Sequence, residues 1–443
     1  MNKSRVKALI VDIIGLESAV AWININSLWS LVKGPLSIYF LVKYLTPQQQ
    51  GIWYTFGSLS ALTTFAELGF TLIISQFVSH EYAKLELRNN ALQGSQFDLD
   101  RIVSLIRYAL KFYSLVVPSA AIGLAVFGFI YFNKESANIL TAWLLYSIVG
   151  GLNLFVTLLY SIYRGLDRVA VIQRNLFIST IILTFVNWLL LYLGFQIWSL
   201  AISGLVGIII SIFLLYRISG SFWLQIFKHQ IIHKFKWFKE IIVLQSKYAI
   251  TFASGYMIFY LYVPTVYKFQ GQIAAGQLGM TLALIQALQG FSSAWLTSRG
   301  PQINILVANN DRVKLYRLIL RSTIISCTIF IIGASAIILF IYFLSFYEKY
   351  SIRFLSLPVL VLILLYQFVP TMLSSISTYL RAHKKEPHLA LSIVISILVV
   401  GSLFIILPHY GLFGLMISIN IIFWLISIPW ILWLFYKYKR IYG

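Results

Sequence analysis

Residues 41–70 read LVKYLTPQQQGIWYTFGSLSALTTFAELGF, and this stretch contains the features that decide the fold. An apolar run ends at Lys43, a short turn with a proline follows, and a second apolar run begins near Gly51. A bilayer-spanning helix needs about 20 mostly apolar residues. The stretch therefore reads as the outer end of one span followed by most of the next, and Glu67 lies deep in that second span.

The same pattern recurs along all 443 residues, of which 60% are apolar and only 11% are charged. Such a composition excludes a soluble globular enzyme, because a soluble core cannot enclose so much apolar surface. We expect an all-α integral membrane protein with twelve transmembrane helices in two pseudo-symmetric six-helix lobes around a central cavity. The predicted spans are residues 18–43, 52–76, 112–132, 139–163, 175–193, 197–216, 248–268, 274–296, 322–345, 354–379, 389–407 and 412–435.

The net charge of +21 comes from 34 Lys and Arg against 13 Asp and Glu. Cytoplasmic loops of membrane proteins collect Lys and Arg, and this bias sets their orientation. With a cytoplasmic N-terminus, 28 of the 34 cations fall on the cytoplasmic side and five on the outer side, which leaves Lys33 inside a span. The charge pattern predicts both termini in the cytoplasm. It also argues against a nucleic-acid partner, because the cations form short clusters between apolar runs.

A weak internal repeat supports the two lobes. When residues 41–51 are aligned with residues 266–276, Lys43 meets Lys268 and Gly51 meets Gly276. Parallel repeats of this kind occur in transporters that bind their substrate between the halves. The predicted organisation is a six-helix lobe over residues 1–216, a basic amphipathic cytoplasmic linker over 217–247 and a second six-helix lobe over 248–443. We expect the linker to lie in the headgroup region, with Phe222, Trp223, Phe227 and Trp237 facing lipid.

Polar side chains inside the spans are candidates for function, because they are costly in a bilayer. Glu67 shares a helix face with Ser60, Thr64, Thr71 and Ser75, which predicts a polar stripe down the second span. Glu67 has either a packing role, in which those hydroxyls bind it, or a role in transport. Lys33 shares a face with Asn26, just before Gly34 and Pro35, and either pairs with Glu67 or reaches the outer interface. The seventh and eighth spans carry the remaining candidates, which are Tyr256, Tyr260, Gln286, Gln289 and Arg299.

No pattern for covalent chemistry accompanies these residues. The predicted outer loops are short, whereas a glycan polymerase or ligase needs a sizeable outer loop. The single cysteine, Cys327, lies in a span, so it provides no disulfide framework or cysteine metal site. His229 and His233 are four residues apart but lack an H-E-x-x-H motif, and no phosphate-binding loop of the G-x-x-x-x-G-K-[ST] type occurs. We expect neither an enzyme nor a metal or cofactor site.

Three segments resemble the bacterial lipid-linked oligosaccharide flippases, the O-antigen flippases of the MOP superfamily. Residues 41–70, followed by SQFVSHEYAK (75–84), resemble the first hairpin of that family. GQLGMTLALIQALQGFSSAW (276–295), with RGPQI (299–303), resembles the matching hairpin of the second half. YRGLDRVAVIQRN (163–175) resembles the short basic loop after the fourth span. The similarity extends over essentially the whole chain.

The resemblance implies a protein of the bacterial inner membrane that moves undecaprenyl-diphosphate-linked repeat units of O-antigen or a similar surface polysaccharide to the outer leaflet. It implies alternating access coupled to a proton or sodium, membrane lipids and glycan-assembly proteins as partners, and a central cavity lined by spans 1, 2, 7 and 8. Lys33 and Arg299 are the candidate diphosphate partners, and Glu67 is the candidate coupling residue. The predicted cavity residues are Asn26, Lys33, Glu67, Tyr256, Tyr260, Gln286, Gln289 and Arg299.

Two alternatives remain at this point. The first is a multidrug or metabolite cation antiporter of the same superfamily, which would share the architecture. The second is a non-transporting scaffold of a glycan-assembly complex. The polar stripes inside the spans argue against the scaffold, and the amide and tyrosine side chains, which suit sugar hydroxyls and ring faces, favour the flippase over the antiporter.

Overall fold

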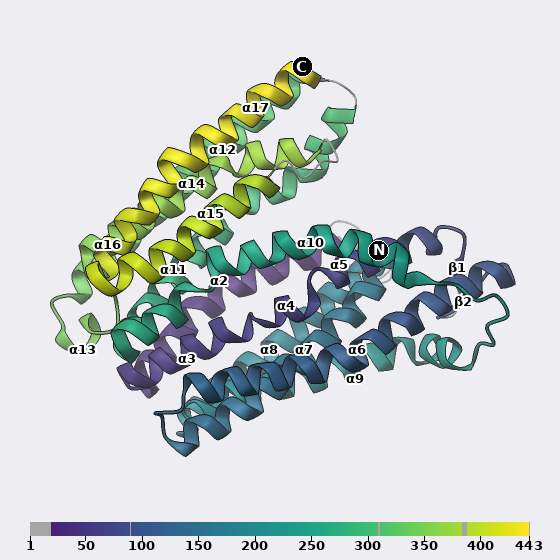
Figure 1. Cartoon of the computed structure of the whole chain (residues 1–443), viewed down its shortest axis with the longest axis horizontal. Coiled ribbons are helices and arrows are strands. Elements are labelled where there is room, and N and C mark those ends of the chain that lie inside the picture. Colours follow the sequence, from purple (N-terminus) through teal and green to yellow (C-terminus); the bar gives the residue numbers. More distant parts are fainter. Residues whose placement is uncertain (1–18, 89, 309–310, 383–387, 443) are drawn as a thin grey trace, which may run out of the picture. The chain divides into compact units, whose positions relative to one another are not determined.

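The computed structural model describes residues 19–442, except residues 89, 309–310 and 383–387. The described chain is almost entirely helical (Figure 1). A two-stranded antiparallel hairpin, β1 (Glu86–Arg88) and β2 (Ala91–Gln93), interrupts the helices. The predicted cytoplasmic segment before the first span, residues 1–17, lies outside the described residues. The cations Lys384 and Lys385 also lie outside them.

Eight helices among the described residues are long and apolar enough to cross a membrane, or nine if the bent pair α3–α4 and α5 is one span. Two of the eight are double length, Tyr248–Leu296 with 49 residues and Leu389–Ile441 with 53 residues. Each contains a glycine at positive φ that interrupts the helix, Gly271 in the first and Gly411 in the second. Together with the 26-residue helix α2, these elements account for the twelve predicted spans. The expected fold class is confirmed.

The chain divides into two compact units. Unit 1 comprises Met1–Ser30 and Leu59–Ala253, and unit 2 comprises Leu31–Ser58 and Ser254–Gly443. The lobe boundaries at residues 216 and 247 stay a prediction. The helices that begin before residue 237 are α2 (Ala19–Tyr44), α3 (Pro47–Ser60), α4 (Thr63–Glu67), α5 (Phe70–Tyr82), α6 (Gln96–Tyr131), α7 (Ala137–Gly165), α8 (Val169–Tyr192) and α9 (Trp198–Lys228).

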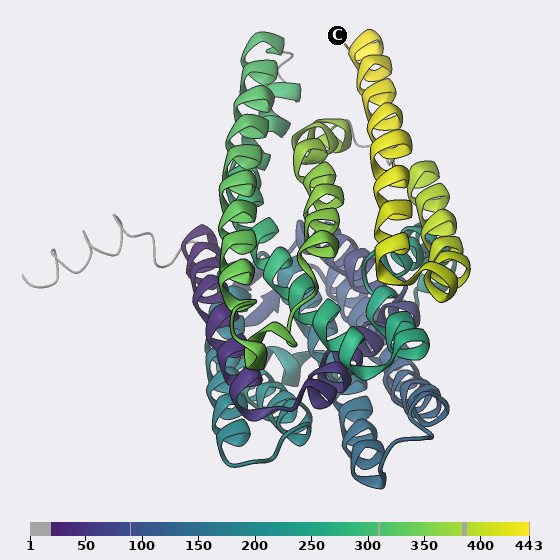
Figure 2. The ribbon, with the colours of Figure 1, turned by 90° about the vertical axis from the view of Figure 1, so that its left-hand side faces the viewer.

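The second half continues from α10, which runs from unit 1 into unit 2. The elements are α10 (Trp237–Phe259), α11 (Tyr262–Ala308), α12 (Arg312–Leu344), α13 (Glu348–Ser351), α14 (Leu357–Ala382), α15 (Leu389–Gly401), the π-helical η1 (Ser402–Ile406), α16 (Leu407–Ile421), the π-helical η2 (Ile422–Ser427) and α17 (Ile428–Tyr442). Figure 2 shows α12 of unit 2 as a long straight helix in green, and α17 in yellow as the last turns of a second long helix that continues from α16 through η2. Helix α14 packs against both.

The core of unit 1 lies where α7 packs against α5, α6 and α9. Trp143 of α7 is fully buried, and its indole N–H donates to the carbonyl of Leu124 on α6 at 2.9 Å. Gly128 makes this contact possible, because a Cβ there would lie 1.7 Å from the Trp143 ring. A buried indole that donates to a partner is expected inside a helical bundle, because an unsatisfied polar group in an apolar interior is costly.

The prediction that residues 217–247 form an amphipathic linker in the headgroup region is wrong in two respects, the path of the backbone and the burial of two aromatic residues. Helix α9 extends to Lys228, and the segment 229–236, which we call the strap, is not helical. Phe222 and Trp237 are 1% and 3% exposed, so their rings lie in the core of unit 1 and not among lipid headgroups. Phe227 is exposed, as predicted. The strap leaves the helical path because its backbone and histidines bind Asp100 of α6.

Unit 2 contains a close crossing of α3 and α11 that follows the sequence repeat. A Cβ added to Gly51 would lie 1.9 Å from the carbonyl oxygen of Gln272, and one added to Gly276 would lie 3.2 Å from that of Pro47. The repeat alignment pairs Pro47 with Gln272, just as it pairs Gly51 with Gly276. The two contacts are therefore equivalent in the two repeats. Arg353, 7% exposed, donates to the carbonyl of Leu45 at 2.6 Å beside the crossing.

Candidate functional site

Glu67 lies at a break in the second span, which was predicted as one continuous helix. Helix α4 ends at Glu67, Leu68 and Gly69 have φ of 48° and 77°, and α5 starts at Phe70. The two helix pieces are bent by 48°. A left-handed residue is common at a helix end, and glycine adopts it without steric cost. The prediction of an unbroken span is wrong here because two consecutive residues take this conformation.

The Glu67 carboxylate joins the two pieces. It accepts a hydrogen bond from the backbone N–H of Thr71 at 3.3 Å and another from the Thr71 hydroxyl. The Thr71 N–H belongs to the first turn of α5, where backbone donors lack helical partners and a negative charge is favourable. The predicted stripe is therefore only partly assembled, since Thr64 donates to the carbonyl of Ala61 and Ser75 is buried in α5. Of the stripe, Thr71 supplies the donors to Glu67.

Helix α10 packs against this break. Gln245 donates its side-chain amide to the carbonyl oxygen of Glu67 at 3.4 Å. A Cβ at Gly69 would lie 2.7 Å from the ring of Phe252 and 3.0 Å from Cβ of Tyr248. Sequence reasoning missed all three α10 residues. The pair Leu68–Gly69 directly after a carboxylate was a signal for a break in the helix. Nothing in the sequence indicated which helix would pack against that break.

The first span contributes Asn26 and Lys33, which belong to different units. Asn26 donates to the backbone carbonyl and the side-chain oxygen of Gln173 on α8, at 2.9 and 3.1 Å. Its amide thus fastens α2 to α8 within unit 1. Lys33 is half-buried in unit 2, and α2 continues as one helix through Pro35. Because Glu67 belongs to unit 1, the ion pair between Lys33 and Glu67 stays a prediction.

The other predicted residues lie in unit 2. The rings of Tyr256 and Tyr260 are stacked, with centroids 6.0 Å apart and planes at 18°. Tyr256 is buried, whereas Tyr260 and Gln286 are exposed. The amide of Gln289 donates to the backbone carbonyl of Gln367 on α14 at 3.2 Å, so part of its hydrogen-bonding capacity is used for packing. Their role as a substrate wall stays a prediction.

Arg299 lies near the end of α11 that was predicted to be cytoplasmic. Its guanidinium carbon is 4.9 Å from the centre of the Trp295 ring, and that of Arg321 on α12 is 5.9 Å from the same ring centre. Arg299 also donates to the side-chain oxygen of Gln302 at 3.3 Å. Two guanidinium groups thus share one indole ring system. Such an arrangement has the charge and the donors to bind a phosphoryl group.

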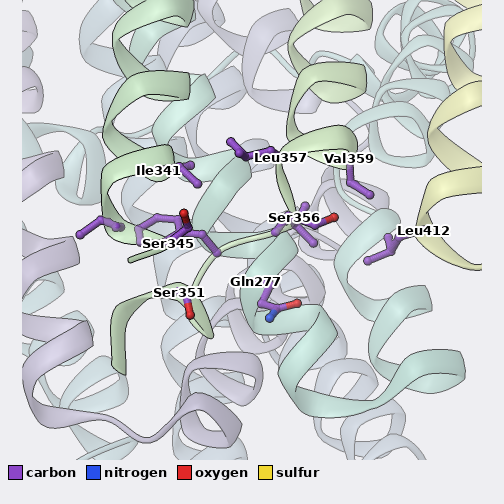
Figure 3. A pocket seen from close by; sticks show the side chains of 11 residues that line it. Gln277, Ile341, Ser345, Ser351, Ser356, Leu357, Val359 and Leu412 are labelled. Carbon is purple, nitrogen blue, oxygen red and sulfur yellow. The ribbon is translucent and has the colours of Figure 1, made fainter. Parts of the chain in front are cut away.

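A cavity of about 400 Å³ lies in unit 2, between the end of α12, the start of α14 and the parts of α11 and α16 that follow their glycine breaks. Figure 3 shows Gln277 and Ser356 with their polar atoms among Ile341, Val359 and Leu412. All eleven lining residues are uncharged. The cavity suits an uncharged or apolar group rather than a diphosphate. Within the described residues, no group of three or more His, Cys, Asp or Glu is arranged to hold a metal ion.

Solved structures with the same arrangement of helices are membrane transporters. The lipid II flippase MurJ in an inward closed conformation aligns with a TM-score of 0.64 at 16% identity, over 94% of this chain and 87% of that one. A multidrug resistance MATE family transporter of the MOP superfamily, inward-facing, aligns with a TM-score of 0.62 at 16% identity, over 94% of both chains. The chain has the MOP fold.

An outward-facing MATE transporter aligns less closely, with a TM-score of 0.51 at 15% identity over 96% of this chain and 98% of that one. No family model matches the sequence, and no curated protein matches it. These identities are too low to transfer a substrate, so they establish the MOP fold alone. Flippases and drug transporters both adopt it, and these neighbours are not enzymes.

Proposed function

We propose that the chain is a flippase that moves undecaprenyl-diphosphate-linked oligosaccharide repeat units across a bacterial inner membrane. A diphosphate headgroup carries two negative charges, so it cannot cross hydrocarbon without a cationic environment. The observation that carries the proposal is the pair Arg299 and Arg321 around Trp295, because it offers cationic, planar donors on the side from which such a lipid would enter. A carrier of cationic drugs has no use for this charge.

Flipping makes and breaks no covalent bond, so the protein has to recognise, shelter and release the headgroup. Lys33 and Arg299 are the proposed diphosphate partners. The stacked rings of Tyr256 and Tyr260 suit sugar faces, and Gln286 has an exposed amide for sugar hydroxyls. Both termini are proposed to be cytoplasmic, with anionic lipid compensating the basic inner loops.

Glu67 is the proposed coupling residue. As a carboxylate it accepts from Thr71 and places negative charge at the start of α5, which ties the two pieces of the broken span together. Protonation removes the charge and converts the group to a weaker acceptor, so the tie weakens. The bend of the span is thereby linked to the protonation state of Glu67. Cation-coupled alternating access requires an element with two conformations whose populations depend on the bound cation. A bend that responds to a proton on Glu67 meets this requirement.

The multidrug or metabolite antiporter remains the second candidate. The specific observation in its favour is the MATE transporter neighbour with a TM-score of 0.62. The uncharged cavity around Gln277 also suits an apolar compound. Glu67 would serve in that case as the site of cation exchange.

Deletion in the native host separates the two functions. The flippase predicts that single lipid-linked repeat units accumulate on the inner leaflet and that the surface glycan is lost. The antiporter predicts unchanged glycan with altered drug tolerance, and that result would overturn the proposal. In the deletion strain, Lys33→Ala is expected to impair glycan export at normal membrane levels, measured by surface-glycan staining. Wild-type export by this variant would remove Lys33 from the mechanism.

A further inference from the structure

Asp100 is a buried carboxylate outside the site described above. It lies in the second turn of α6 with no exposed surface. Its oxygens accept from Nε2 of His229 at 2.7 Å, Nδ1 of His233 at 2.9 Å and the amide of Gln96 at 3.0 Å. The backbone N–H groups of Ile232 and His233 also donate to it, at 3.0 and 2.9 Å. Because a carboxylate only accepts, five donors converge on this one group.

Those donors come mainly from the strap, and further α6 side chains bind its two ends. The Arg107 guanidinium donates to the carbonyls of Ile226 and His229 at 2.8 and 2.7 Å, where α9 ends. The indole N–H of Trp237, the first residue of α10, donates to the Ser104 hydroxyl at 3.0 Å. The α6 residues that bind the strap and its ends follow helical spacing along one face, and they are Gln96, Asp100, Ser104 and Arg107.

The strap leads directly into the helix that covers the break at Glu67. Gln245 follows Trp237 after about two helical turns of α10. Gln245 donates to the Glu67 carbonyl, and Phe252 lies against Gly69. A helix transmits a shift of its first turn along its axis. The anchoring of the strap therefore sets how α10 meets the broken span, and all these contacts lie within unit 1.

The electrostatics around Asp100 favour a permanent anchor. Burial alone would raise the pKa of Asp100, but the hydrogen bonds from His233, His229 and Ile232 outweigh it and hold the pKa well below its usual range. The carboxylate is therefore ionised throughout the physiological pH range. The other charged groups on the surrounding elements are Glu81 with its partner Arg101, Asp98, Arg107, Lys228, Lys234, Lys236, Lys239 and Glu240.

We propose that Asp100 is a positioning residue for transport, which acts through the strap and α10 to hold the break at Glu67 in its working geometry. The inference rests on the proposed function, since it assigns the transport role to Glu67. Asp100 has no exposed surface with which to contact a substrate, so it acts through the strap. An apolar residue at this position would leave the strap donors unsatisfied, so the anchoring of the strap depends on an acceptor at residue 100.

Hydrogen–deuterium exchange on the purified full-length protein tests the mechanical part. Asp100→Asn places an amide N–H₂ against the strap donors with little change in volume. We expect exchange to rise about tenfold or more in the strap, in residues 237–252 and in residues 62–72, because an opening free energy lowered by about 1.4 kcal/mol gives a tenfold change. The matched control is Glu86→Gln, which makes the same kind of carboxylate-to-amide change, breaks an exposed ion pair with Arg88 and touches none of the strap contacts named above.

Flipping in proteoliposomes tests the transport part. The probe is undecaprenyl-diphosphate-linked N-acetylglucosamine with a fluorescent label on the sugar, followed by dithionite quenching. We expect Asp100→Asn to flip about tenfold more slowly and Glu86→Gln to flip close to the wild-type rate. Unchanged exchange in residues 62–72 of Asp100→Asn overturns the proposal. Raised exchange with wild-type flipping also overturns it, because the strap would then be merely structural.

Two further variants keep the test decisive. If Asp100→Asn does not reach the membrane, the double variant His229→Ala/His233→Ala removes the two imidazole donors and keeps both backbone donors. In that double variant, glutamine in place of alanine at position 229 (His229→Gln/His233→Ala) restores one side-chain donor. This change is expected to recover part of the protection from hydrogen exchange and part of the flipping rate. If Glu67→Gln flips like the wild type, the proposed function of Glu67 fails, whereas the exchange comparison still decides whether the strap controls the break.

Discussion

The second and eighth spans occupy equivalent positions in the two repeats, yet their backbones differ at residues 67–69. The alignment that pairs Gly51 with Gly276 also places Glu67 on Ser292 and Gly69 on Ala294. The second span breaks there and bends by 48°, whereas α11 continues through Ser292 and Ala294 as helix. Where the repeats agree, at Gly51 and Gly276, they make equivalent contacts. The repeat therefore supplies the scaffold, and the departure from it at residues 67–69 supplies a titratable group at a bend.

The largest expected effect follows from this departure. Glu67→Gln keeps the size of the side chain but removes the charge at the start of α5. We expect lipid-linked glycan flipping to fall by about tenfold or more at normal membrane levels. The matched change in the other repeat, Ser292→Ala, is expected to leave flipping close to wild type, because the Ser292 hydroxyl donates within its own helix to the carbonyl of Leu288. Equal losses in both variants would contradict a special role for the second span.

The next largest effect is expected at Gly51, a position where the two repeats agree. Gly51→Ala would put a Cβ 1.9 Å from the carbonyl oxygen of Gln272, so α3 and α11 have to separate. We expect a loss of about 1–3 kcal/mol in the free energy of unfolding, measured by thermal or denaturant unfolding in detergent. Gly57→Ala is the control on the same helix, because no atom of the described residues lies within 4 Å of its added Cβ. It is expected to be neutral or slightly stabilising.

A second difference between the halves concerns the loop after the fourth span of each. The alignment of residues 164–168 with residues 381–385 there places Val171 on His388. Burial, and then the charge of Arg381, lower the pKa of His388 to about 4. The unfolded chain therefore takes up a proton at a higher pH than the folded chain, and stability falls as the pH drops from about 6.5 toward 4.

At pH 5 this histidine is expected to cost the folded state about 2 kcal/mol relative to pH 8. His388→Asn keeps a side-chain donor and cannot titrate, so its melting temperature should fall less than that of the wild type over the same range. The comparison is made by thermal unfolding at pH 8, 6.5 and 5. Parallel curves for the two proteins would show that His388 is not the group responsible.

The smallest effect concerns the bend itself. Gly69→Ala forces a residue with a side chain into a φ of 77° and presses Cβ against the Phe252 ring. Since the ring can move, we expect a loss of about 1–2 kcal/mol in stability, accompanied by slower flipping. Gly255→Ala on α10, whose Cβ would meet no described atom within 4 Å, is the control. Unchanged stability and flipping in Gly69→Ala would show that the bend tolerates either residue.

Much of the fold could be predicted because its signals are local. The apolar runs, the one-sided distribution of Lys and Arg and the glycines of the repeat need no knowledge of distant contacts. Glu67 could also be singled out, since a carboxylate within an apolar run is conspicuous in any sequence. The break beside it was less visible, because Leu68 and Gly69 read as part of a continuous apolar stretch.

The sequence by itself determined the all-helical membrane class, the number of spans and the rarity of charge inside them, because bilayer thickness and the cost of burying charge act on each segment separately. Only the tertiary structure decided what surrounds the charges. Asp100 of α6 gains His229 and His233 from the strap, and Glu67 gains Gln245 from α10. Such partners are determined by how the helices pack. Packing brings together residues that are far apart in the chain, and no regular spacing in the sequence indicates which residues will meet.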